Sequence, residues 1–229
     1  MTVAPTDRSN IPSRNLGFFE EPTMTARSGE DQALCIFFVR MRSNFQKGSD
    51  LRISSARLLK DLRVSSTLPL ATPELTRQCT AWFHGHASEL KTIRHLDIPP
   101  YNRKHMMKNQ SILCLLPRQI ALFTEVTVLC LNNASLTSLP AAIGDLTKLR
   151  QLILKNGQLK GLPQEIRELK ELEVLDLSRN WQLSSLPDLT PLIKLAQLYL
   201  APPNQIRSSD LVTLYFHNKV VVHLRAQPV

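Results

Sequence analysis

The most regular feature of this sequence is a pattern of leucines that begins near residue 111 and recurs at steps of 23 residues, the last step being 24. Each unit contains a Leu-Pro pair, and the pairs are Leu116-Pro117, Leu139-Pro140, Leu162-Pro163 and Leu186-Pro187. Each unit continues with an apolar-x-x-Leu-x-Leu core, and the cores end at Leu131, Leu154, Leu177 and Leu200. Because alternate residues of a strand face the same side, each core predicts one short strand with buried leucines. Such units cannot bury their apolar face alone, so they are predicted to stack into a solenoid.

This pattern resembles the leucine-rich repeat family. The Leu-Pro-x-x-Ile-x-x-Leu motif is similar to the 23-residue class of that family, which is found in intracellular signalling proteins and bacterial effectors. The resemblance covers residues 111–216, with a further strand expected at Ile93, Leu96 and Ile98. It implies an α/β solenoid, namely a short horseshoe with a parallel sheet on its concave side. It also implies a non-catalytic function in binding another protein.

The sequence departs from the family pattern at the asparagine that usually follows the last strand leucine by three residues. Those positions hold Ala134, Gly157, Asn180 and Pro203. Other asparagines lie one residue away, at Asn133, Asn156 and Asn204. We therefore expect an incomplete ladder of hydrogen bonds between the turns, with waters as substitutes. An extra residue, Trp181, accounts for the 24-residue step, and its ring is expected to bulge from the edge of the sheet.

The segment before the repeats is predicted to be a helical cap. Apolar residues from Leu75 to Leu90 recur at three- and four-residue steps, and Thr72-Pro73-Glu74 is typical of a helix start, so a helix is expected at 73–91. A shorter helix is expected near residues 51–62, whereas 33–45 fits a helix or a strand. The predicted organisation is a disordered tail at 1–32, a helical N-terminal cap at 33–92, leucine-rich repeats at 93–216 and a C-terminal capping strand at 217–229.

The strand positions that alternate with the core leucines are expected to form a partner-binding concave face. Ile153, Val174 and Tyr199 are candidate anchors on this surface. The full predicted set is Val128, Cys130, Asn132, Gln151, Ile153, Lys155, Val174, Asp176, Ser178, Arg179, Gln197 and Tyr199. Asn133 and Ala201 extend it at the strand ends.

The formal net charge of +9 raises the question of an anionic partner. Residues 33–110 carry thirteen Lys and Arg against five Asp and Glu, so the basic excess is regional. These side chains offer contacts to nucleic acid or to an anionic membrane surface, but a solvated helix face is the usual role of such residues. No nucleic-acid-binding signature and few stacking aromatics accompany them, which argues against nucleic acid.

The sequence gives little support for catalysis, and neither a cofactor nor a metal is predicted. Cys35, Cys79, Cys114 and Cys130 form no Cys-x-x-Cys pair, which indicates neither a zinc site nor a disulfide framework and favours a reducing compartment. His84 and His86 lie on opposite sides of the expected helix and lack a completed ligand set. No phosphate-binding loop or nucleophile motif is present.

The N-terminal segment has no apolar run that fits a signal peptide, so a cytoplasmic protein without a membrane span is expected. Its polar, proline-containing composition resembles the export tails of bacterial effectors, which implies export to a host cell without a cleaved signal peptide. Two alternatives remain at this point. One is a substrate-recognition subunit of a ubiquitin ligase with residues 33–70 as adaptor-binding helices, and the other is a repeat fragment of a larger enzyme.

Overall fold

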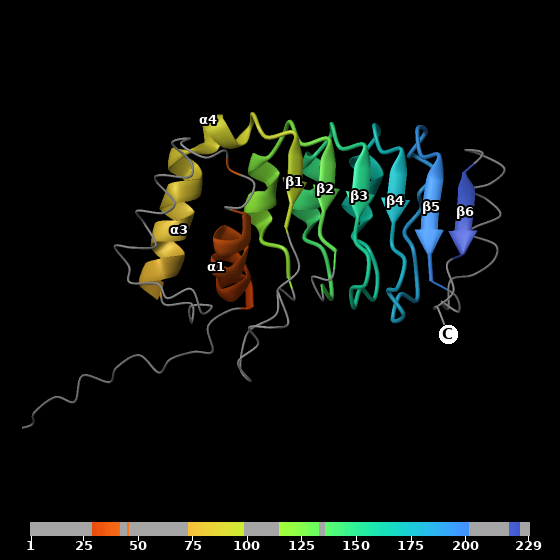
Figure 1. Cartoon of the computed structure of the whole chain (residues 1–229), viewed down its shortest axis with the longest axis horizontal. Coiled ribbons are helices and arrows are strands. Elements are labelled where there is room, and N and C mark those ends of the chain that lie inside the picture. Colours follow the sequence, from red (N-terminus) through yellow and green to blue (C-terminus); the bar gives the residue numbers. More distant parts are fainter. Residues whose placement is uncertain are drawn as a thin grey trace, which may run out of the picture.

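The computed structural model describes residues 29–41, 45, 73–98, 115–132, 136–201 and 220–224. The helix expected near residues 51–62 and the shortened repeat expected at Leu211, Leu214 and Phe216 lie outside the described residues. The described part contains a sheet with 3₁₀-helices behind it and α-helices at one end (Figure 1). It therefore has the layered α/β architecture that the leucine pattern predicts.

The sheet has six parallel strands that neighbour one another in sequence order. They are β1 (His95–Asp97), β2 (Val128–Cys130), β3 (Gln151–Ile153), β4 (Val174–Asp176), β5 (Gln197–Leu200) and β6 (Val221–Leu224). The register places Leu96, Leu129, Leu152, Leu175 and Leu198 side by side, and each is 0% exposed. The 23-residue step is thus the distance along the chain between paired residues of β2, β3, β4 and β5, and the fold is an open, solenoid-like stack of these repeating units.

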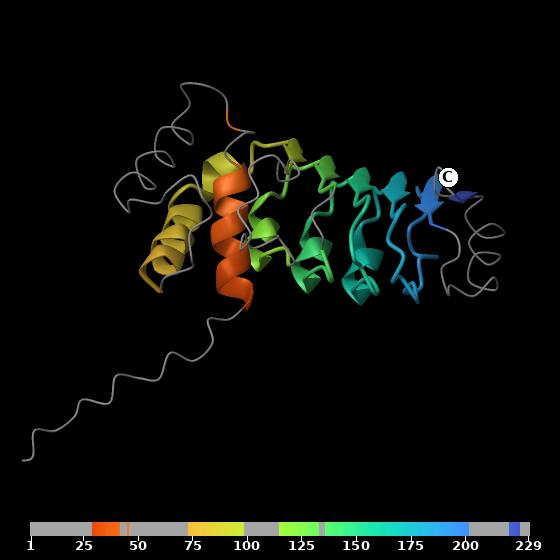
Figure 2. The ribbon, with the colours of Figure 1, turned by 60° about the horizontal axis from the view of Figure 1, so that its bottom comes forward.

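A second layer forms where the chain returns behind the sheet after each Leu-Pro pair. Its 3₁₀-helices are η3 (Arg118–Leu122), η4 (Ala141–Asp145) and η5 (Gln164–Glu168). Figure 2 shows them lined up on the opposite side from the strands. The proline before each one has an extended backbone, with φ between −72° and −69°. Because proline cannot donate a backbone hydrogen bond, it suits this position at the start of a helical turn.

The fourth Leu-Pro pair is followed by irregular backbone instead of a 3₁₀-helix. The extra residue of this repeat falls in the turn at Trp181, whose side chain is 39% exposed. Trp181 therefore lies in a turn that follows β4, and not in a strand. Leu189 and Leu192 still fill the core at 2% and 0% exposure, and paired residues of β4 and β5 are still 23 apart, so the segment after Pro187 is shorter by one residue and the apolar contacts are kept.

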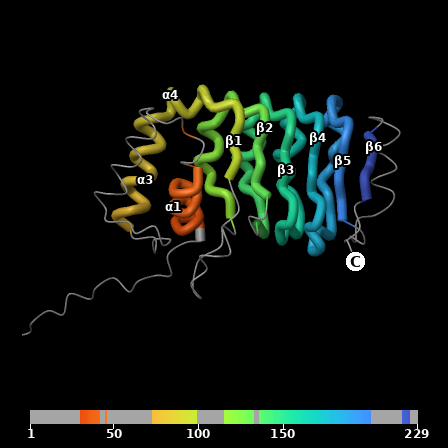
Figure 3. The backbone as a smooth tube through the Cα atoms, viewed as in Figure 1, coloured from red at the N-terminus to blue at the C-terminus, as the bar shows by residue number. Residues whose placement is uncertain are grey.

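The α-helices are α1 (Gly29–Met41), α3 (Pro73–Gly85) and α4 (Ala87–Leu90). Residues 33–45, for which the sequence fitted a helix or a strand, are thus helical up to Met41. Helix α1 begins at Gly29, before residue 33, where the helical cap was expected to start. The helix expected at 73–91 is present in two pieces that meet at His86. The helices lie at the β1 end of the sheet (Figure 3).

Aromatic rings join these helices to one another and to the first repeat. Phe37 of α1 stacks on Phe83 of α3 at a centroid distance of 6.1 Å and meets Phe123 edge-on, also at 6.1 Å. Phe123 follows η3, so α1 packs against the residues that close the first repeat. The helices and the repeats consequently share one continuous apolar core.

At the other end of the sheet, Val221, Val222 and Leu224 lie in β6, which pairs with β5. Val222 is opposite Leu198, which continues the inward row. Val221 and Leu224 are 53% and 61% exposed. Within the described ranges, β6 pairs with β5 only.

Among the described residues, none of the helices combines the length and the hydropathy that crossing a bilayer requires.

Candidate functional site

The candidate site is the side of the sheet that points away from the leucine core, which we call the outward face. The register aligns two rows of outward positions across β2 to β5. One row is Val128, Gln151, Val174 and Gln197, and the other is Cys130, Ile153, Asp176 and Tyr199. The structure therefore brings the predicted strand residues together on one face.

Most of the predicted site residues have partial contact with solvent on this face. Gln197 and Arg179 are exposed. The residues of intermediate exposure are Val128, Cys130, Asn132, Gln151, Ile153, Lys155, Val174 and Tyr199. Asn133 lies outside the described residues, and Ala201 is 0% exposed.

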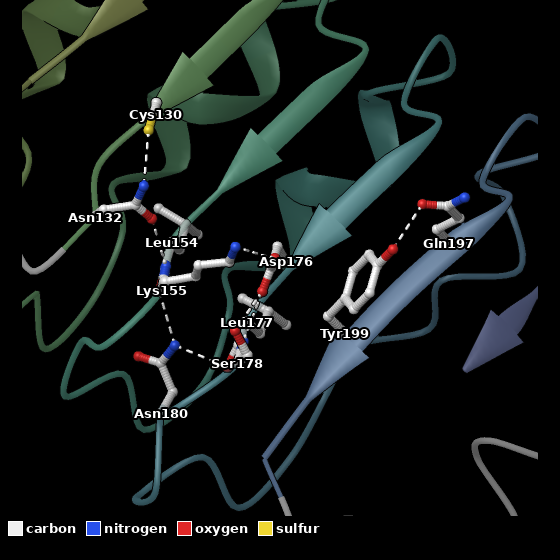
Figure 4. Close-up of polar contacts among 10 residues, drawn as sticks. All are labelled: Cys130, Asn132, Leu154, Lys155, Asp176, Leu177, Ser178, Asn180, Gln197 and Tyr199. Carbon is white, nitrogen blue, oxygen red and sulfur yellow. Dashed lines mark hydrogen bonds and ion pairs between the residues drawn. The ribbon is translucent and has the colours of Figure 1, made fainter. Parts of the chain in front are cut away.

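Asp176 and Ser178 differ from the expectation of an accessible surface, because they are 4% and 3% exposed. One carboxylate oxygen of Asp176 accepts hydrogen bonds from the Ser178 backbone N–H at 3.0 Å and from the Ser178 hydroxyl at 2.6 Å. The other oxygen lies 3.2 Å from Lys155 Nζ (Figure 4). A buried carboxylate needs such partners, and the three bonds supply them. Asp176 and Ser178 therefore hold the turn and Lys155, and they offer little surface to a partner.

Polar contacts extend from this cluster toward β2. The Lys155 backbone N–H donates to Asn132 Oδ1 at 3.3 Å, and Asn132 Nδ2 donates to Cys130 Sγ at 3.0 Å. The bond between Lys155 and Asn132 crosses from one repeat to the next, whereas the bond from Asn132 to Cys130 stays within one repeat (Figure 4). The ends of β2, β3 and β4 are thus held together by side chains of the outward face.

An aromatic pair occupies the β5–β6 part of the outward face. The rings of Tyr199 and His223 stack with centroids 4.4 Å apart and an interplanar angle of 12°. The Tyr199 hydroxyl also donates to Gln197 Oε1 at 2.9 Å. Sequence reasoning missed His223, although the alternation within the expected closing strand places it on the same side as Tyr199. The stack fixes a rigid aromatic surface, which is a common anchor for protein partners.

The cysteine on this face is not an activated nucleophile. Partial burial raises the pKa of the Cys130 thiol, and the negative charge of Asp97 raises it further. A higher pKa leaves less thiolate at neutral pH, and the thiolate is the reactive form. In the part of the chain that the structure describes, no group of three His, Cys, Asp or Glu side chains is placed to hold a metal ion. His86 is instead used in packing, because its ring stacks on Trp82 at 4.4 Å.

The turns below the strands depend on one buried amide. Asn180 is 0% exposed, and its Nδ2 donates to the backbone carbonyls of Leu154 and Leu177 at 2.8 and 2.9 Å. Its Oδ1 accepts the Leu159 N–H at 3.2 Å. A Cβ added at Gly157 would lie 2.5 Å from this oxygen. Glycine at the position where the family usually has asparagine therefore leaves the room that the Asn180 amide of the next repeat needs.

Two equivalent turn residues have a left-handed backbone. Asn156 has φ 56° and Arg179, 23 residues later, has φ 61°. Asparagine tolerates this conformation better than other side chains do, and a longer side chain is disfavoured there. Asn156, one residue before the position of the family asparagine, thus serves the turn through its left-handed backbone.

Arg179→Asn is accordingly expected to stabilise the protein by about 0.5–1 kcal/mol, because asparagine relieves the unfavourable conformation. Chemical denaturation monitored by circular dichroism measures the change. Arg167→Asn, at an exposed position in η5, is the matched control and is expected to give no gain. An equal or larger gain in the control would contradict the role of backbone conformation.

Comparison with solved structures finds chains with local similarity to this one. A leucine-rich repeat protein of Leptospira interrogans is 26% identical over 50% of this chain and 33% of that chain, with a TM-score of 0.34. The functional domain of InlJ from Listeria monocytogenes is 20% identical over 53% of this chain and 32% of that chain, with a TM-score of 0.34. The leucine-rich repeat domain of the type III effector XopL is 16% identical over 88% of this chain and 97% of that chain, with a TM-score of 0.33.

This chain thus spans about a third of the length of the first two structures. No family model matches the chain, and no curated protein matches its sequence. The repeating units of this chain are seen in its own strand register and 23-residue step.

Proposed function

We propose that this chain is a protein-interaction module that binds a protein partner through the outward face of its sheet and catalyses no reaction. The observation that carries the proposal is the continuity of this face. Side chains of intermediate exposure follow one another across β2, β3, β4 and β5, while the inward leucines are used entirely in the core. A wide surface of mixed aliphatic, aromatic and polar groups suits a protein better than a small molecule, which needs a concave pocket.

The charges beside the outward face also favour a protein partner. Arg150 and Glu173 lie 3.7 Å apart, and Lys155 pairs with Asp176. Because these cations have acidic neighbours, this part of the surface lacks the excess positive charge that binding to phosphates requires. Residues 33–110, whose basic excess raised the question of binding to nucleic acid or to an anionic membrane, lie largely outside the described residues.

The proposed contact residues follow from exposure and from the buried role of Asp176 and Ser178. Apolar and aromatic anchors are provided by Ile153, Val174 and Tyr199, which are spread over three adjacent strands. The other residues of the proposed contact set surround these anchors, and they are Val128, Cys130, Asn132, Gln151, Lys155, Arg179 and Gln197. Asp176 and Ser178 act by positioning Lys155.

Tyr199→Glu is expected to weaken binding of the partner at least tenfold, because it replaces an aromatic anchor with a charge. Affinity capture with the full chain identifies candidate partners, and titration calorimetry then compares the dissociation constants of parent and variants. Ile193→Glu is the matched control, since Ile193 is 74% exposed and lies outside the strands. Its binding should equal that of the parent.

Equal loss of binding in both variants would contradict a site on the outward face, as would unchanged binding of Tyr199→Glu. Gln197→Arg adds a second test on the same face, because Gln197 is exposed and is not itself part of the Tyr199–His223 ring stack. Circular dichroism confirms that each variant is folded. Loss in Tyr199→Glu and Gln197→Arg, with retention in Ile193→Glu, supports the proposal.

The proposal assigns the α-helices the role of covering the first end of the repeat stack. Ala33, Leu34, Cys35, Ile36, Phe37 and Phe38 are each at most 4% exposed. An adaptor-binding role in a ubiquitin ligase requires an exposed apolar patch on these helices, and the described part of 33–70 has its apolar side chains in the core. Burial therefore favours a cap over an adaptor surface.

Export into a host cell is a more specific form of the proposal. It rests on the polar, proline-containing composition of residues 1–32. Fusing these residues to a reporter enzyme tests it, with secretion of the reporter by a bacterium that carries an effector export system as the expected result. A reporter retained in the bacterial cytoplasm would contradict export and leave partner binding unaffected.

A further inference from the structure

Two cysteines meet inside the interface between α1 and α3. Cys35 on α1 is 1% exposed and Cys79 on α3 is 0% exposed. Cys35 Sγ lies 3.8 Å from the hydroxyl oxygen of Thr76, which is one helical turn before Cys79. Residues three apart on a helix share a face, so Thr76 and Cys79 both present themselves to α1.

Ring contacts one turn further along fix the register of the two helices. Phe38 lies three residues after Cys35, and its ring meets those of Trp82 and Phe83 at 5.0 and 5.9 Å. Trp82 in turn lies three residues after Cys79. The two helices therefore run side by side in the same direction (Figure 2). The flanking contacts place Cys35 level with Cys79.

We propose that Cys35 and Cys79 are a dithiol that forms a disulfide between α1 and α3 under oxidising conditions. A disulfide needs cysteines at facing positions on closely spaced backbones, and the flanking contacts hold these helices in that arrangement. The proposal concerns the helices and does not depend on the proposed binding function.

The reaction is thiol–disulfide exchange with a low-molecular-weight disulfide such as glutathione disulfide. The Cys35 thiolate attacks one glutathione sulfur, the glutathione S–S bond breaks, and the departing glutathione thiolate takes up a proton. The Cys79 thiol then loses its proton and attacks Cys35 Sγ, which forms the protein disulfide and releases the second glutathione. Two protein thiols are oxidised and one glutathione disulfide is reduced to two thiols.

The environment of the two thiols assigns the attacking group. A hydrogen bond from the Cys79 thiol lowers the pKa of Cys35 in opposition to burial, whereas the pKa of Cys79 is raised. Cys35 is thus the thiol that ionises first, and the thiolate is the nucleophile. Both sulfurs are buried in the docked helices, so glutathione disulfide reaches Cys35 during folding, as α1 approaches α3 and the contact with Cys79 forms, and the exchange is slower in the folded chain.

The bond would tie α1 to α3 across the segment that connects them. Closing this long loop restricts the unfolded chain, which stabilises the folded state. The same chain would therefore have a reduced, less stable form in a reducing compartment and a crosslinked, more stable form outside it. The cysteines that were assigned no role from their spacing acquire one from the fold.

The experiment refolds the full chain in a glutathione redox buffer, blocks the remaining thiols with iodoacetamide and maps the peptides by mass spectrometry. The expected result is a peptide pair joined through Cys35 and Cys79, with Cys114 and Cys130 alkylated. The Tm of the oxidised chain is expected to exceed that of the reduced chain by about 5–10 °C. The wild-type chain provides both states, so this comparison does not depend on a variant that folds.

Matched variants test the assignment to this pair. Cys79→Ala is expected to abolish the difference in Tm between oxidised and reduced protein, whereas Cys130→Ala is expected to retain it. Alkylation of both Cys35 and Cys79 after refolding in oxidised glutathione would overturn the proposal. Pairing of either residue with Cys114, or equal Tm values for the linked and reduced chains, would overturn it as well.

Discussion

Asn180→Ala is expected to lower the free energy of unfolding by about 3 kcal/mol. The substitution removes three hydrogen bonds at 2.8, 2.9 and 3.2 Å. It leaves the carbonyls of Leu154 and Leu177 and the N–H of Leu159 without this buried partner, and leaving buried polar groups unsatisfied costs more than the bonds themselves contribute. Urea unfolding monitored by circular dichroism at equal protein concentration measures the change.

Asn132→Ala is the matched control for this prediction. The Asn132 amide accepts one backbone hydrogen bond, from Lys155 at 3.3 Å, and the residue is only half-buried. Water can replace that bond, so the expected loss is at most about 1 kcal/mol. Similar losses in the free energy of unfolding for Asn180→Ala and Asn132→Ala would contradict the larger stabilising role that we assign to the buried Asn180 amide.

Gly157 allows a test of the same contact from the other side. Gly157→Ala places a Cβ 2.5 Å from Asn180 Oδ1, so it must displace the amide or the turn. In a protein that already carries Asn180→Ala, this clash is absent. The double variant is therefore expected to lose less stability than the sum of the two single variants. If the loss of stability in the double variant equals the sum of the two single losses, the effect of Gly157→Ala does not arise from a clash with Asn180.

The repeats were predictable from sequence because their period is set by geometry. One strand per 23 residues, with leucines at alternate positions, leaves a single register, and the structure has it at Leu129, Leu152 and Leu175. The incomplete asparagine ladder was also expected. The physical reason for the incomplete ladder could not be predicted. The left-handed turn at Asn156 and the room that Gly157 leaves for Asn180 depend on contacts between repeats.

The burial of side chains on the outward face is harder to predict from sequence than the face of the sheet to which they point. Alternation places Asp176 on that face, but its burial results from Ser178 two residues later and from Lys155 in the turn that follows β3. The ambiguity at residues 33–45 has a related cause. The run from Ala33 to Phe38 is apolar at every position and gives no period, because α1 is buried on several sides by α3 and by the first repeat.

Phe37→Ala is expected to lower the free energy of unfolding by about 3–5 kcal/mol, because it leaves a cavity where α1, α3 and the first repeat meet. Phe37 is 0% exposed and contacts both Phe83 and Phe123. If the helices cover the end of the repeat stack, this loss destabilises both parts together. The chain's two tryptophans lie one in each part, Trp82 in α3 and Trp181 in the repeats.

Single-tryptophan variants therefore report on the two parts separately. Trp181→Phe leaves the fluorescence of Trp82, and Trp82→Phe leaves that of Trp181. We expect Phe37→Ala to move the urea midpoint at both probes to the same extent. Leu175→Ala creates a cavity behind the middle of the sheet and is expected to cost about 2–5 kcal/mol. It should also move the urea midpoint equally at both probes. A Phe37→Ala transition that moves at Trp82 and stays in place at Trp181 would mean that the repeats fold without the helices, and the helices would then need a role other than covering the leucines of the first repeat.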